Sequence, residues 1–80
     1  TIDNTSKYLL STILIFMSIA QNLKKYRKKK GVSQDKLSKL ADVTYNTIIK
    51  LESGATKNPR VETLRLIAKA LDVNVDDLLK

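Results

Sequence analysis

The chain has 80 residues, which allows one domain with a small core. Lys and Arg number 15 against eight Asp and Glu, and the net charge of +7 favours a polyanionic partner, either nucleic acid or an anionic membrane surface. Cys and His are absent, which excludes disulfides, thiol nucleophiles and the usual zinc ligands. With few glycines and no glycine-rich loop, most familiar catalytic sites are excluded as well. We therefore expect a protein that is not an enzyme, with no cofactor and no metal site, and the lack of Cys fits a cytoplasmic location.

The first segment of the chain is apolar and weakly charged, and it ends in the run YLLSTILIF over residues 8–16. Even when it is extended through Ala20, this run is shorter than the roughly 20 residues that a membrane span needs. Lys7 alone is a weak basic flank for a signal peptide. Met17 comes directly after this run and is a candidate for the first residue of the natural protein. Residues 1–16 are therefore either a native N-terminal extension or a segment that the natural protein lacks.

The next segment is predicted to form a helix that begins at Ser18. Ser18 and Gln21 match the capping box, in which the hydroxyl and the amide satisfy opposite ends of the first turn. Gly31 is expected to end the helix in the left-handed conformation. The basic run over residues 24–30 is expected to be a solvated face that adds to the general electrostatic field. Three apolar residues recur at helical spacing and are expected to face a core: Ile19, Leu23 and Tyr26.

A second helix is predicted to begin after Ser33. The Ser33 hydroxyl is a typical N-cap, and the helix dipole favours Asp35 in the first turn. Asp42 and Val43 are expected to make the turn that follows, since Asp tolerates the left-handed conformation better than most residues. The buried face of this helix is predicted to consist of three residues: Leu37, Leu40 and Ala41.

A third helix is predicted between a Thr44 cap and Gly54, with Ile48 and Leu51 facing the core. Hydrogen-bonding side chains gather on another face of this short helix: Thr44, Tyr45, Asn46 and Lys50. In a strongly basic chain, such a face suggests a helix that reads DNA base edges in the major groove.

The rest of the chain reads as a polar loop and two further helices. The loop spans residues 55–60, and Asn74 is expected to cap a last short helix that buries Leu78, with Asp76 and Asp77 in its first turn. The helix between them carries four apolar residues at helical spacing: Leu64, Ile67, Ala68 and Leu71. No segment alternates convincingly with period 2, so the sequence predicts an all-α domain of five helices.

Residues 19–79 resemble the helix-turn-helix domain of phage repressors and Cro proteins, and of the bacterial regulators built in the same way. The matching segments are KKYRKKKGVSQDKLSKLA, VTYNTIIKLESG, the loop TKNPR and the ending LRLIAKALDVNVDDLL. The resemblance implies a compact, lambda-repressor-like fold over residues 18–80, with residues 1–17 as an apolar N-terminal extension.

The resemblance also implies roles for individual residues. The base-reading positions are occupied by Thr44, Tyr45, Asn46 and Lys50. Contacts with DNA phosphates are implied at Ser33, Gln34, Thr47, Lys57, Asn58 and Arg60. Arg27 and Glu52 match a structural ion pair that ties the first helix to the third. Tyr45 is bulky for its position, so it contacts either a base or a phosphate.

Besides Tyr45, two further positions depart from the family pattern. Asp42 stands in the turn where Gly is common, and Ile49 stands where a polar residue is usual. We expect Ile49 to be a partly exposed apolar residue without a role, although contact with a thymine methyl group or with a partner subunit is an alternative.

The function implied is that of a sequence-specific DNA-binding transcriptional regulator, by default a repressor, that binds double-stranded DNA at a near-palindromic operator as a homodimer. Residues 1–16 are expected to serve association rather than DNA reading, because an exposed apolar patch usually marks an interface. Two alternatives remain open: an antitoxin-type regulator that binds a toxin protein through this segment, and a membrane-associated DNA-binding protein, which the short apolar run makes less favourable.

Overall fold

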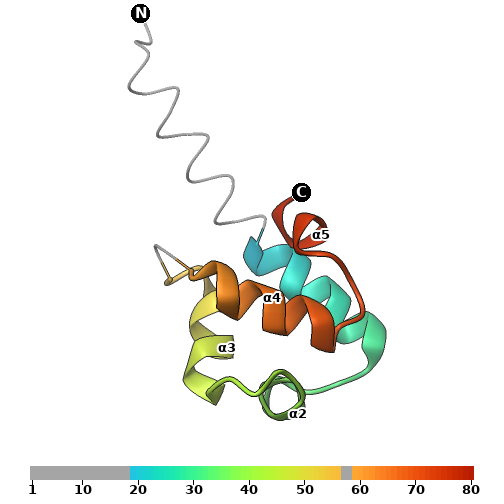
Figure 1. The fold of residues 1–80 in the computed structure, drawn as a ribbon. Helices are drawn as coiled ribbons and strands as arrows, with labels where there is room; N and C mark the ends of the chain where they lie inside the picture. Colours follow the sequence, from blue (N-terminus) through green and yellow to red (C-terminus); the bar gives the residue numbers. More distant parts are fainter. Residues whose placement is uncertain (1–18, 57–58) are drawn as a thin grey trace, which may run out of the picture.

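A computed structural model describes residues 19–56 and 59–80, and the described residues form helices and turns without any strand. A helix over residues 19–30 is followed by α2 (Gln34–Ala41), α3 (Tyr45–Ser53), α4 (Val61–Ala70) and α5 (Val75–Leu79). The α2 helix packs against α3 and α4, and α4 packs against α5, so that α2 and α5 lie on opposite sides of α4 (Figure 1). The prediction of an all-α fold with five helices is confirmed.

The hydrophobic core draws on every helix. The largest fully buried side chains come one from each helix in chain order: Leu23, Leu37, Ile48, Ile67 and Leu78. Tyr26 is partly buried and packs against this cluster, as predicted. Because no helix can bury its apolar face without the others, the core is complete only when all five helices have docked.

The helices begin where the sequence predicts, through hydrogen bonds across a single turn. Ser33 Oγ accepts the backbone N–H of Lys36 at 3.0 Å, and this bond begins α2. At the start of α5, Asp77 Oδ2 accepts the N–H of Asn74 at 3.0 Å. Ser18 and the capping box predicted for it lie outside the described residues, but Ile19 is buried at the beginning of the first described helix.

Three helices end in the left-handed conformation at the predicted residues. The φ angles are +76° at Gly31, +57° at Asp42 and +78° at Gly54. At Asp42 the turn is closed by the N–H of Val43, which donates to the carbonyl of Ser38 at 3.0 Å. This turn sets the direction in which α3 leaves α2, and Asp42 supports it although a β-carbon there meets strain that glycine avoids.

The prediction that Leu40 lies in the core is wrong. Its side chain is 47% exposed, whereas Ser38 is buried in the same helix. The structure presents Leu37, Ser38 and Ala41 to the core, and the short side chain of Ser38 suits a close approach of helices. Its hydroxyl donates to the carbonyl of Asp35 at 2.6 Å, so its burial leaves no polar group without a partner.

The contrast between buried Leu37 and half-exposed Leu40 can be tested by comparing the stability of two variants of α2. Leu37→Ala removes a fully buried side chain and should lower the free energy of unfolding by roughly 2–5 kcal/mol. Leu40→Ala makes the same chemical change at a half-exposed site and should lower it by only about 0.5 kcal/mol. Urea unfolding followed by circular dichroism measures both values, and equal losses would contradict the packing described for α2.

Candidate nucleic-acid interface

The α3 helix divides its side chains between the core and the outside. Ile48 and Leu51 are buried, while Asn46 and Lys50 are exposed on the opposite side and Tyr45 is 46% exposed. Since successive residues advance about 100° around the axis, Asn46 and Lys50 share one face and extend away from the domain. Three of the predicted base-reading residues are therefore accessible on the outside of one short helix.

The fourth candidate, Thr44, has a local role as well. Thr44 Oγ1 accepts the N–H of Thr47 at 3.2 Å and lies 2.8 Å from the Thr47 hydroxyl. These two threonines thus begin α3, which confirms Thr44 as the cap. The hydroxyl contact between them also orders the Thr47 side chain, which the sequence placed among the phosphate candidates.

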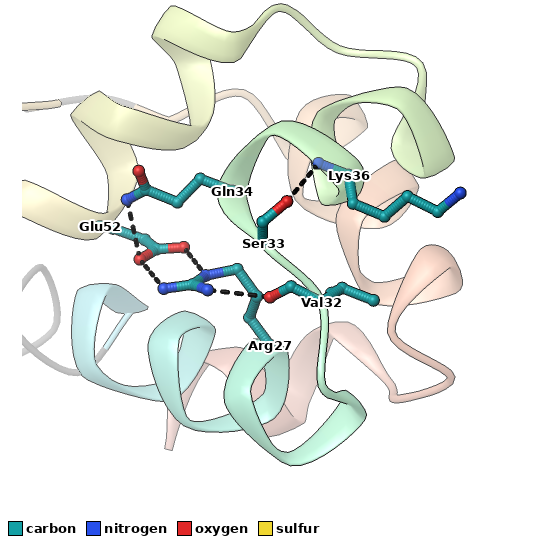
Figure 2. Close-up of polar contacts among 6 residues, drawn as sticks. All are labelled: Arg27, Val32, Ser33, Gln34, Lys36 and Glu52. Carbon is teal, nitrogen blue, oxygen red and sulfur yellow. Dashed lines mark hydrogen bonds and ion pairs between the residues drawn. The ribbon is translucent and has the colours of Figure 1, made fainter.

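Arg27, Gln34 and Glu52 form a partly buried polar network between three helices (Figure 2). Arg27 donates from Nε to Glu52 Oε2 at 2.6 Å and from Nη2 to Glu52 Oε1 at 3.0 Å, which is the bidentate geometry of a strong guanidinium–carboxylate pair. A third nitrogen, Nη1, donates to the carbonyl of Val32 at 2.9 Å. The predicted structural ion pair is confirmed.

Gln34 joins this network as its third side chain. Its Nε2 donates to Glu52 Oε1 at 3.2 Å, so the amide in the first turn of α2 is held against the end of α3. Glu52 accepts these bonds although its side chain is only 2% exposed, and no buried polar side-chain atom of the described residues lacks a partner. This hydrogen bond fixes the position of the Gln34 amide, and so also the direction of its carbonyl oxygen and second N–H.

An open hollow lies between α3 and the beginning of α4. Five of the side chains that line it are polar or charged: Thr47, Lys50, Thr56, Arg60 and Thr63. The sequence singled out Thr47, Lys50, Arg60 and the loop that begins at Thr56, but not Thr63. Thr63 lies three residues after Arg60. This spacing puts both residues on the same side of the first turn of α4, and it is the feature of the sequence from which Thr63 could have been predicted. The candidates Lys57 and Asn58 lie outside the described residues.

Further positive charge lies along the exposed side of the first helix. The exposed lysines of this helix are Lys24, Lys25, Lys28, Lys29 and Lys30. Lys30 pairs with Asp72 at 2.8 Å across the surface. The described residues contain no group of acidic side chains that suits a metal ion and no helix that is long and apolar enough to cross a membrane.

Comparison with known proteins identifies the family. Residues 23–78 match the helix-turn-helix family model. The HTH-type transcriptional regulator SinR of Bacillus subtilis (strain 168) is 36% identical over 61 residues, which cover 76% of this chain and 55% of that protein. SinR of Bacillus licheniformis matches with the same identity and coverage.

A solved structure gives the same result. The N-terminal DNA binding domain of SinR from Bacillus subtilis superposes with a TM-score of 0.75 at 35% identity, over 78% of this chain and 90% of that one. The chain therefore belongs to the helix-turn-helix family. It spans about half the length of the curated relatives that it matches.

The polar network predicts a large difference between two ion pairs. Arg27→Ala leaves the buried carboxylate of Glu52 without its partner and should lower the free energy of unfolding by roughly 3–5 kcal/mol. Lys30→Ala breaks the exposed pair with Asp72 and should cost at most about 1 kcal/mol. Chemical unfolding of the two variants measures this, and similar small losses for both would show that the Arg27–Glu52 pair does not hold the helices together.

Proposed function

We propose that this protein is a DNA-binding transcriptional regulator that recognises its site by placing α3 in the major groove. The observation that carries the proposal is the outward face of α3, where Asn46 and Lys50 are exposed on a domain of net charge +7. Membership of the helix-turn-helix family and the likeness to the DNA binding domain of SinR support the same function. Its place of action is then the cytoplasm, where the DNA of a bacterium or a phage is found.

Base recognition follows from the chemistry of the exposed side chains. The Asn46 amide can donate from Nδ2 to N7 of adenine and accept from the adenine N6 amino group through Oδ1, as a bidentate pair, and Lys50 can donate to O6 or N7 of guanine. Tyr45 is at the N-terminal end of α3, where its hydroxyl can reach a base edge or a phosphate. We assign sequence reading to these residues, with the Thr44 methyl group as a further contact.

Phosphate contacts orient the domain on the duplex. Gln34 is in the first turn of α2, where backbone N–H groups and the helix dipole favour an anion, and Glu52 holds its amide in place. Ser33, Thr47 and Arg60, together with Lys57 and Asn58 of the loop, complete the proposed set. These contacts carry affinity without sequence information, since every phosphate is alike.

We further propose that two copies bind a near-palindromic operator, with one α3 in each of two successive major grooves. The half-sites would then lie about 34 Å apart, one turn of the DNA helix. Such a dimer placed over a promoter would exclude other proteins and repress transcription. Residues 1–16, outside the described residues, are the proposed site of a further protein contact.

Affinity for duplex DNA should depend steeply on salt. If a dimer neutralises roughly 6–10 phosphates, the logarithm of the association constant should fall against the logarithm of salt concentration with a slope of about −5 to −9, because bound counterions are released. Fluorescence anisotropy of a labelled duplex between low and physiological salt measures the slope. A slope near zero would rule out this function.

Variants of α3 and of the α4 start should separate specificity from affinity. Asn46→Ala should remove the preference at one base pair and weaken binding to the selected site by roughly 1–3 kcal/mol. Arg60→Ala should weaken binding to selected and scrambled DNA alike and leave the selected sequence unchanged. Selection from a random duplex pool, repeated for each variant, gives the comparison. An unchanged sequence profile for Asn46→Ala would contradict its assignment as a base-reading residue.

A further inference from the structure

The outward face of α3 carries an apolar row beside its polar one. Tyr45 and Ile49 are one helical turn apart and are 46% and 37% exposed. They run alongside Asn46 and Lys50, which form the neighbouring row of the same helix. The exposed side of the helix therefore offers both hydrogen-bonding groups and a hydrocarbon surface.

Ile49 is not one of the buried residues that form the domain core. Ile48, the preceding residue, is fully buried, and Leu51 supplies the next core contact of α3. Ile49 points away from both and lies beside Asn46 on the helix surface, in the row that runs alongside Asn46 and Lys50. Its side chain is 37% exposed, so part of its hydrocarbon surface is accessible to a bound duplex.

The major groove presents a single apolar group to such a side chain. This group is the C5 methyl of thymine, whereas the other base edges offer hydrogen-bond donors and acceptors. An isoleucine beside a donor row can therefore select thymine at one position, because any other base leaves the apolar surface against a polar edge or against water.

We propose that Ile49, flanked by the ring of Tyr45, is a specificity-determining residue that packs on a thymine methyl group. This inference rests on the proposed function, since it requires α3 to lie in the major groove. Because Asn46 and Ile49 are neighbours on the helix surface, the thymine lies next to the base pair that Asn46 reads. Ile49 would then distinguish thymine from the other bases at one position of the site.

Deoxyuridine tests this contact because it lacks only the methyl group. The duplex selected by the full chain from a random pool is remade with each thymine replaced in turn, and affinity is measured by anisotropy. For the unaltered protein, one replacement per half-site should weaken binding by about fourfold, the value expected for one buried methyl group. Ile49→Ala should bind the thymine and deoxyuridine duplexes equally at that position, and alanine keeps the helix.

Leu79→Ala is the matched control, because it truncates another exposed apolar residue, on α5, away from α3 (Figure 1). It should keep the full response to deoxyuridine. The proposal is overturned if the unaltered protein responds to no replacement, or if Ile49→Ala keeps the response. It is also overturned if Ile49→Ala changes only the self-association seen by sedimentation, since Ile49 would then face a second copy. Failure to select any sequence would instead refute the proposed function.

Discussion

The ion pair between Arg27 and Glu52 is the contact on which the arrangement of the other helices depends. It joins the first helix to α3 with hydrogen bonds of 2.6 and 3.0 Å, and it is shielded from water, since the carboxylate side chain is 2% exposed. Gln34 adds α2 to the same carboxylate (Figure 2). A buried charge that has lost its partner is strongly unfavourable, so the network tolerates only positions of the three helices in which the bonds are made. It thereby fixes the angle at which α3 faces outward.

Local hydrogen bonds set the ends of α3, and apolar packing holds the helix against the core. The Thr44 cap and the left-handed Gly54 set where the helix begins and ends, within a few residues of chain. Ile48 then anchors it to a core in which every helix supplies one fully buried side chain. As a result Asn46 and Lys50 need no support from other side chains to remain accessible. A rigid helix with a free outer face loses little conformational entropy on binding, which favours specific recognition.

The charge of the domain serves the long-range attraction of DNA, whereas the side chains of α3 serve the discrimination between sequences. Lysines spread over the first helix raise the local potential and attract a polyanion at long range, but a diffuse field does not distinguish sequences. Discrimination requires directional donors such as Asn46 and, by our proposal, the hydrocarbon of Ile49. The hollow at the junction of α3 and α4 is lined by Lys50, which we assign to base reading, and by Arg60, which we assign to phosphate contact.

The sequence by itself determined the features that depend on neighbours in the chain. Ser33 and Thr44 as caps, and Gly31 as a helix end, follow from bonds across one turn, and helical spacing located the buried Ile48 and Ile67. The Arg27–Glu52 pair came from resemblance to a family. Tertiary structure decided what depends on residues far apart. It exposed Leu40 and buried Ser38, because periodicity defines a face but not its centre. It also brought Gln34 to Glu52 and directed the Asn22 amide to the carbonyl of Leu78 at 3.0 Å, contacts across 18 and 56 residues that no local pattern encodes.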